Sequence, residues 1–250
     1  MPKRLLCCIF VTQNFENTTI MGIISSSIAR KVAMALSGLF LVFFLGQHFT
    51  INLTSVIDPD TFNEWSHFMG TNILVQAVLQ PILIFGVIFH FIMGFILEIR
   101  NRNARAVKYN SFKGNTNSTW ASRNMIISGL VILAFLGLHF YDFWAPEMNI
   151  KYFKGDMSGL LDPDNVNSGF RYYEELVHKF ESPIRVGIYC LSFILLAVHL
   201  WHGFASSFQS VGFNNKYSKA LTKFAKVYAV VIPLGFIFIA LYLHLNQLPH

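Results

Sequence analysis

Charge and cysteine are both scarce in this chain of 250 residues. Only 13% of the residues are charged, whereas 54% are hydrophobic and 16% are aromatic, a balance far from that of an ordinary soluble domain. The three cysteines, Cys7, Cys8 and Cys190, show no paired spacing, so we expect no disulfide framework. They are too few to hold an iron–sulfur cluster, and no G-x-G-x-x-G fingerprint for a dinucleotide occurs.

Long apolar segments, by contrast, are abundant. A membrane-spanning helix needs about 20 predominantly apolar residues, and five stretches of the sequence reach this length. They are residues 32–53, 72–98, 124–145, 184–208 and 225–246. None of them shows the large polar face of a soluble amphipathic helix. The sequence therefore predicts an all-α integral membrane protein with five transmembrane helices.

The basic residues indicate an orientation through the positive-inside rule. The connections after the second and fourth spans are rich in lysine and arginine, whereas residues 54–71 and 146–183 are dominated by acids. We therefore expect the N-terminus and both basic connections in the cytoplasm and the C-terminus outside. Because the basic residues are divided between short loops beside membrane helices, we expect no nucleic-acid binding.

Residues 1–24 are predicted to form an extension outside the membrane domain, which covers residues 25–250. The segment LLCCIFV is too short to span a membrane, and no small-residue cleavage site follows it. Met21 opens MGIISSSIARK directly before the first span. We therefore expect a misassigned start at Met1, with a short amphipathic arm as the alternative.

Four histidines lie inside four different spans. At a rise of 1.5 Å per residue, His90 and His199 lie roughly 12–14 Å from the cytoplasmic ends of their spans, and His48 and His139 lie roughly 22–24 Å from theirs. The two levels are about 10 Å apart. Depth pairs His90 with His199 and His48 with His139. An ionisable imidazole inside a membrane is costly and usually has a partner or a function.

Two imidazoles at each level match the axial ligands of haem iron, because the porphyrin supplies the other four nitrogens. Zinc or copper would need further ligands nearby. His90 and His199 also share the patterns FHFIMGF and VHLWHGF, in which Gly94 and Gly203 follow on the same helix face and make room for a flat macrocycle. No C-x-x-C-H motif occurs, so we expect two stacked b-type haems inside the helix bundle.

The other histidines are weaker candidates. His202 follows His199 by three residues and is its main competitor as a ligand, although contact with a haem propionate or another helix is our preferred interpretation. The rest are expected at or beyond the outer boundary, facing solvent: His67, His178, His244 and His250. The alternative for the intramembrane histidines is packing or hydrogen bonding. A transporter with histidine proton relays would also need acids inside the spans, where we expect none.

The histidine contexts resemble the cytochrome b membrane anchor of dihaem succinate:quinone oxidoreductases, in its single-subunit, five-helix form. The similar stretches are GQHFTINL, FHFIMGFI, LGLHFYDFW and HLWHGFASSFQSVGFNN, and the resemblance extends from about Ser25 to the C-terminus. It implies that His90 and His199 hold a haem on the cytoplasmic side. It also implies that His48 and His139 hold the outer haem, which agrees with the pairing from depth.

The resemblance implies partners as well. A flavoprotein subunit, which would hold the dicarboxylate site, and an iron–sulfur subunit would dock on the cytoplasmic face of a bacterial inner membrane, over residues 100–123 and 209–223. This chain, surrounded by membrane lipid, would be the non-flavin subunit of the enzyme. It would pass electrons through the inner and outer haems to a quinone, commonly menaquinone. A higher oligomer of the complex is also compatible with the family.

Two related functions are the main alternatives. Some dihaem fumarate reductases carry a glutamate two residues before the fourth ligand, where this chain has Ala197. Together with the expected absence of carboxylates from the span interiors, this difference favours succinate oxidation over quinol-driven fumarate reduction. The membrane cytochromes b of nitrate reductase or formate dehydrogenase place their histidines on fewer helices than the four used here.

The quinone site has an outer and an inner candidate. The outer segment NEWSHFMGTN resembles a family segment near the distal haem and offers Glu64, Trp65, His67 and Asn72. The inner candidates resemble polar residues of monohaem relatives and are Ser27, Arg30 and Lys31. For the inner set, anchoring at the membrane surface or contact with a haem propionate is preferred. We therefore predict that the quinone binds at the outer end, with simple solvation of His67 as the alternative.

Overall fold

The computed structural model describes residues 26–103 and 125–247. Several sequence predictions therefore lie outside the described residues. These are the N-terminal extension 1–24 with Cys7 and Cys8, most of the proposed docking segment 100–123, and His250.

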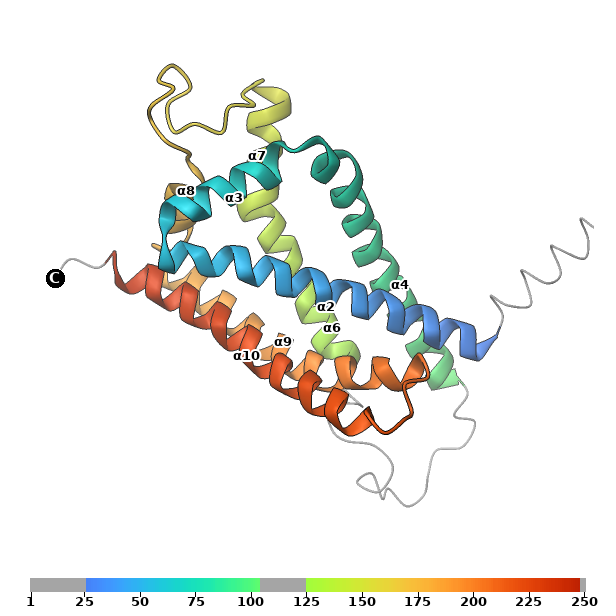
Figure 1. Cartoon of the computed structure of the whole chain (residues 1–250). Helices are drawn as coiled ribbons and strands as arrows, with labels where there is room; N and C mark the ends of the chain where they lie inside the picture. Colours follow the sequence, from blue (N-terminus) through green and yellow to red (C-terminus); the bar gives the residue numbers. More distant parts are fainter. Residues whose placement is uncertain (1–25, 104–124, 248–250) are drawn as a thin grey trace, which may run out of the picture.

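Five helical segments are long and apolar enough to cross a membrane, which confirms the predicted all-helical architecture. In chain order they are α2 (Ser27–Ile57); η1 (Val75–Leu79) with α4 (Gln80–Asn103); α6 (Met125–His139) continued by η2 (Phe140–Trp144), α7 (Ala145–Met148) and η3 (Asn149–Phe153); α9 (Pro183–Ser210); and α10 (Ser218–Leu245). Successive spans run in opposite directions (Figure 1). No β-strand occurs in the described parts of the chain.

The third span is longer than predicted and continues to Phe153 rather than ending near residue 145. Its helix widens into a π turn at η2, where the amide of Ala145 donates to the carbonyl of Phe140. This turn lies directly before Pro146, which has no amide hydrogen to donate and is tolerated at the start of α7. The helix therefore continues through a residue that usually ends one.

Two short helices cover one end of the bundle (Figure 1). α3 (Pro59–Thr71) starts at a proline, and the Asp58 carboxylate accepts from the amide of Asp60 at 3.3 Å. α8 (Tyr172–Lys179) packs against α3. Residues 54–71 are thus largely helical rather than an open loop, whereas in residues 146–183 helices flank the non-helical segment 154–171. We call α3, α7, η3, the segment 154–171 and α8 the cap, and the opposite end, with the α9–α10 connection, the basic end.

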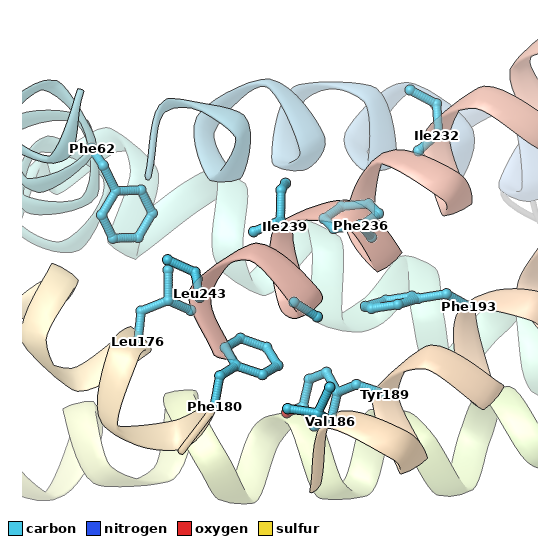
Figure 2. Close-up of a cluster of buried hydrophobic side chains, with 11 residues drawn as sticks. Phe62, Leu176, Phe180, Val186, Tyr189, Phe193, Ile232, Phe236, Ile239 and Leu243 are labelled. Atoms are coloured by element: carbon cyan, nitrogen blue, oxygen red, sulfur yellow. The ribbon is translucent and has the colours of Figure 1, made fainter. Parts of the chain in front are cut away.

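The best-packed part of the molecule lies where α9 and α10 run together. Ala225 and Ala229 of α10 are fully buried, so the backbones of these two helices approach closely, as membrane helices do at small residues. A cluster of buried apolar side chains from α3, α8, α9 and α10 joins this pair to the cap (Figure 2). It comprises Phe62, Leu176, Phe180, Val186, Tyr189, Phe193, Ile232, Phe236, Ile239, Ala240 and Leu243.

Candidate cofactor site

His90 of α4 and His199 of α9 form one imidazole pair, which lies toward the basic end. The pair is defined by its level in the bundle, which the serine contacts of the two rings mark. Each ring contacts a serine on a neighbouring helix through its Nδ1 atom. The distance is 3.0 Å from His90 to the Oγ atom of Ser37 on α2, and 3.1 Å from His199 to the Oγ atom of Ser128 on α6. We call these four residues the basic-end pair and its serines.

The glycines that follow these serines keep the backbone close to the rings. A Cβ atom on Gly38 would meet the Cε1 atom of His90 at 3.4 Å, and one on Gly129 would meet the Cε1 atom of His199 at 3.8 Å. The glycines noted in the sequence have other neighbours. Gly94 and Gly203 lie beside the terminal methyl groups of Met34 and Met125, respectively.

His48 of α2 and His139 of α6 form the second pair, toward the cap. Their ring centroids are 5.8 Å apart and their planes are at 84°. Two imidazoles that bind one metal ion from opposite sides, with bonds of about 2 Å, would have centroids about 6 Å apart. The Nδ1 atom of His139 is buried and has no hydrogen-bond partner within the described residues. We call His48 and His139 the cap-end pair.

Aromatic rings surround the cap-end pair. Phe44 stacks on His48 at 5.5 Å between centroids, and Phe135 stacks on His139 at 6.0 Å. Phe143, Tyr189 and Phe236 complete this wall, and Tyr189 and Phe236 belong to the buried cluster of Figure 2. The cap-end pair therefore lies in an apolar, aromatic environment, whereas each ring of the basic-end pair contacts a serine hydroxyl.

The structure thus brings together the same histidines that depth pairs in the sequence, but the separation of the levels differs. Ser37 marks the level of His90 on α2, and His48 follows eleven residues later on the same helix. At 1.5 Å per residue the levels are about 16 Å apart, rather than the expected 10 Å. The sequence estimate is too short because it measured depth from predicted span ends that do not lie at one level.

An internal repeat explains why the two serines occupy matching places. Residues 34–48 and 125–139 share the pattern M-x-x-S-G-x7-G-x-H. Each of these segments packs beside a helix with the pattern H-x-x-x-G, which begins at His90 in α4 and at His199 in α9. One half of the repeat is α2 with α4, and the other is α6 with α9. Each imidazole pair contains one histidine from each half. Sequence analysis missed Ser37 and Ser128, although this repeat was a signal that pointed to them.

A buried carboxylate lies three residues after His139, contrary to the expectation that no span contains one. Asp142 is 1% exposed. It accepts a hydrogen bond from the Tyr189 hydroxyl at 2.9 Å and pairs with Arg185 at 3.3 Å. Two partners on α9 make this charge tolerable inside the third span. The sequence prediction failed because Arg185 and Tyr189 are distant from Asp142 along the chain.

The outer quinone candidates lie in the cap. His67 stacks on Phe170, with centroids 4.0 Å apart and planes at 14°, and it also contacts Tyr172. His67 is therefore half-buried, and the expectation that it faces solvent is wrong. Burial, followed by the charges of Lys151 and Arg171, lowers its pKa. Glu64 and Trp65 are exposed on α3, so the three candidates do not share one environment.

Charged side chains hold the parts of the cap together. The ammonium group of Lys151, at 3% exposure, donates to the carbonyl of Gly70 and pairs with Glu147 at 2.7 Å. The other oxygen of Glu147 pairs with Arg171, which also pairs with Glu175 at 2.9 Å. These contacts connect the end of the third span to α3 and α8, and a buried network of this kind is sensitive to the loss of any one partner.

The remaining candidates have varied surroundings. His202 is half-buried on α9. His178 is exposed and lies 3.1 Å from Glu181, whereas His244 is half-buried with its Nδ1 atom 2.8 Å from the carbonyl of Phe180, so its expected solvent exposure is wrong. The inner candidates Ser27, Arg30 and Lys31 lie in the first turns of α2. In the docking segment 209–223, α9 ends at Ser210 and α10 begins at Ser218, so the non-helical connection is residues 211–217.

Comparison with known proteins adds no relative. No protein-family model, no curated protein and no solved structure matches the chain. The class that the structure itself defines is an all-helical protein with five helices suited to cross a membrane. Within residues 26–103 and 125–247, no three histidine, cysteine or acidic side chains come together as a possible metal site. Each level contains two imidazoles.

Proposed function

We propose that this chain is the membrane anchor and electron-transfer subunit of a succinate:quinone oxidoreductase. One haem b would bind to His90 and His199, and the other to His48 and His139. The observation that carries the proposal is the gathering of four histidines from four helices into two pairs at two levels. The histidine contexts that resemble the dihaem cytochrome b family support the same assignment.

The residues at both levels fit haem. The cap-end pair has the centroid separation that two axial ligands require and an aromatic wall that suits a porphyrin face. At the basic end, each imidazole is hydrogen-bonded through Nδ1, and metal-bound histidines commonly have such a partner on the second nitrogen. Haem b supplies a one-electron couple between ferric and ferrous iron. The apolar helices around both pairs exclude water from them.

The two ends of the bundle suit different tasks. The basic end carries Arg100, Arg102, Lys216 and Lys219, which would attract an acidic surface of the iron–sulfur subunit. The cap carries most of the acids and would face the opposite side of a bacterial inner membrane. Electrons that move from the basic end to the cap would then be driven by the membrane potential, by about 2.3 kcal/mol per charge per 100 mV.

Reduction of a quinone at the cap end, with menaquinone as the expected substrate, also requires protons. His67 and Asp142 are titratable groups of the described cap and third span, and Asp142 lies close to His139 along the chain. An outer quinone site near the cap-end pair therefore remains part of the proposal, with His67, Glu64 and Trp65 as its candidate residues.

A quinol-oxidising fumarate reductase is the second candidate function. The buried carboxylate of Asp142 favours it, because a proton path across the membrane needs titratable groups inside the spans. Ala197, which stands where some fumarate reductases carry glutamate, favours succinate oxidation. Both functions use the same two imidazole pairs and the same partner subunits.

The proposal is tested with the complex isolated through a tag on this chain. We expect flavoprotein and iron–sulfur subunits to copurify, with succinate oxidised when either a quinone or a soluble dye is the acceptor. Cross-links to the partners should reach Lys216 and Lys219 and be absent from residues 154–171. Purification of the chain without such subunits would contradict the proposal, and so would cross-links from these subunits to the cap. Replacement of both His67 and Glu64 should abolish quinone turnover alone, and unchanged turnover would move the site to Ser27 and Arg30.

A further inference from the structure

The two serines of the basic-end pair are not equivalent to ordinary buried hydroxyls. Ser37 donates its proton to the carbonyl of Met34 at 2.8 Å, and Ser128 donates to the carbonyl of Met125 at 3.0 Å. The same oxygen atoms lie 3.0 and 3.1 Å from the Nδ1 atoms of the two imidazoles. Each hydroxyl therefore has one acceptor and one ring nitrogen within hydrogen-bond distance.

This arrangement distinguishes the two neutral tautomers of each histidine. A serine has one hydroxyl proton but can also accept hydrogen bonds. If the imidazole carries its proton on Nδ1, the serine accepts from the ring and donates to the carbonyl, so both contacts are favourable. If the proton is on Nε2, the single hydroxyl proton must serve either the ring or the carbonyl. The other contact would then place two lone pairs against each other at about 3 Å.

From this geometry we infer that Ser37 and Ser128 are positioning residues that hold His90 and His199 with the proton on Nδ1 and a free lone pair on Nε2. Nε2 is the nitrogen that a histidine then presents to a metal ion. The tautomer follows from the serine contacts alone, whereas its effect on a haem rests on the proposed function. Because the two halves of the repeat place the serines alike, both axial positions are prepared in the same way.

The cap-end pair has no such support. The Nδ1 atom of His139 has no hydrogen-bond partner in the described chain. The side-chain amide nitrogen of Asn52 donates to the backbone carbonyl of His48 at 2.8 Å and lies 3.5 Å from each ring nitrogen of His48, so it does not select one tautomer. The hydroxyl effect should therefore be confined to one of the two haems.

A hydrogen bond from Nδ1 makes the imidazole a more basic ligand and favours ferric over ferrous iron. Replacement of Ser37 or Ser128 by alanine should therefore raise the midpoint potential of the basic-end haem and leave the cap-end haem unchanged. The double variant should show a larger shift than either single variant, since each serine acts through a different histidine. Ser37→Thr, which keeps the hydroxyl, should restore the original potential.

Two buried serines serve as matched controls. Ser55 of α2 and Ser207 of α9 also donate to the carbonyl three residues earlier, but within the described residues neither hydrogen-bonds to an imidazole. Redox titration of the purified complex should show unchanged potentials in Ser55→Ala and Ser207→Ala. Equal potentials in wild type and in the Ser37→Ala, Ser128→Ala double variant, with both haems retained, would overturn the positioning role. A shift of the cap-end haem alone would overturn it as well.

The tautomer can be measured without reference to haem. In the chain labelled with [15N]histidine, the ring signals of His90 and His199 are assigned by their loss in His90→Gln and His199→Gln. Dithionite is added so that any bound haem iron is in the ferrous form. We expect the proton of each ring on Nδ1, and we expect the Nδ1 signal to move in the serine variants but not in the controls. A proton on Nε2 in the haem-free chain, or on neither nitrogen, would contradict the inference. A wild-type chain with the predicted tautomer but no haem would contradict the proposed function alone.

Discussion

The two imidazole pairs lie in the same bundle but are supported in different ways. At the basic end, each ring is hydrogen-bonded to a serine, and glycines bring the neighbouring backbone close. At the cap end, aromatic rings surround the pair, and a buried carboxylate with two partners lies one helical turn further along. One pair is oriented by directional polar contacts, whereas the other is confined by packing.

This difference has a physical consequence for cofactor tuning. Hydrogen bonds to a ligand change its basicity directly, while aromatic walls act through dielectric and shape. Two haems with identical ligand sets would therefore have different reduction potentials. The serine hydrogen bonds would lower the potential of the basic-end haem, and the membrane potential would add its own driving force to transfer toward the cap.

The largest expected effect follows from removal of a ligand. His90→Ala or His199→Ala should remove the basic-end haem and about half of the b-type absorbance, whereas His48→Ala or His139→Ala should remove the other haem. Cofactor binding stabilises the folded state by mass action, so assembly should also decrease. The measurement is the haem content of the purified chain together with the midpoint potential of the haem that remains.

His202 provides the control for this set, because it lies one turn from His199 on the same helix. His202→Ala should retain both haems. Loss of a haem from His202→Ala but not from His199→Ala would show that the fourth ligand has been wrongly assigned.

The next effect concerns the carboxylate beside the cap-end pair. Asp142→Ala leaves the Tyr189 hydroxyl without its acceptor and Arg185 without its counter-ion, and it should cost about 1–3 kcal/mol of stability. A lower thermal midpoint in detergent should accompany a shift of the cap-end haem alone. Asp164→Ala, in the exposed cap segment, is the matched control and should change neither quantity. Equal midpoints in both variants would mean that the buried ion pair contributes nothing.

The smallest effect is the pH dependence of the cap. Burial, then Lys151 and Arg171, holds the pKa of His67 below its ordinary value of 6.5. The neutral ring is thus the favoured form, so its contribution to stability is complete above pH 6.5 and is lost as the pH falls through the lowered pKa. Protection of the amides in residues 154–171, measured as exchange relative to the intrinsic rate at each pH, should be weaker at pH 5.5 than at pH 7.5.

A ring substitution separates this effect from general acid sensitivity. His67→Phe keeps the stacking on Phe170 and should remove the pH dependence. His178→Phe, at an exposed position, should leave it intact. A loss of protection at pH 5.5 that is the same in His67→Phe as in wild type would assign the pH sensitivity to other groups of the cap.

The sequence was sufficient for the helices because the membrane imposes length and apolar composition on each span. The same constraint made the four histidines conspicuous and placed them at two depths. The predicted separation of those depths was wrong, because it was counted from predicted helix ends. Where a helix extends beyond the apolar core of the membrane, its composition does not show where it ends. The helical cap was also missed, because α3 and α8 are short and polar, so their packing against each other is what reveals them.

The surroundings of the histidines were harder to predict than the histidines themselves. Ser37 and Ser128 resemble any helical serine until the rings of His90 and His199 lie beside them. Asp142 is acceptable inside a span only because Arg185 approaches from another helix. These contacts are between residues far apart in sequence, and hydropathy and spacing carry little information about them. The repeat of residues 34–48 in residues 125–139 was the one local pattern that indicated such an arrangement.

The reduced-minus-oxidised optical spectrum of the purified chain, combined with its haem-to-protein ratio, tests the central claim most directly. Two imidazole pairs predict a b-type spectrum with two haems per chain, which titrate at two separate potentials. A chain without haem, or with one haem that survives replacement of either histidine in a pair, would contradict the account.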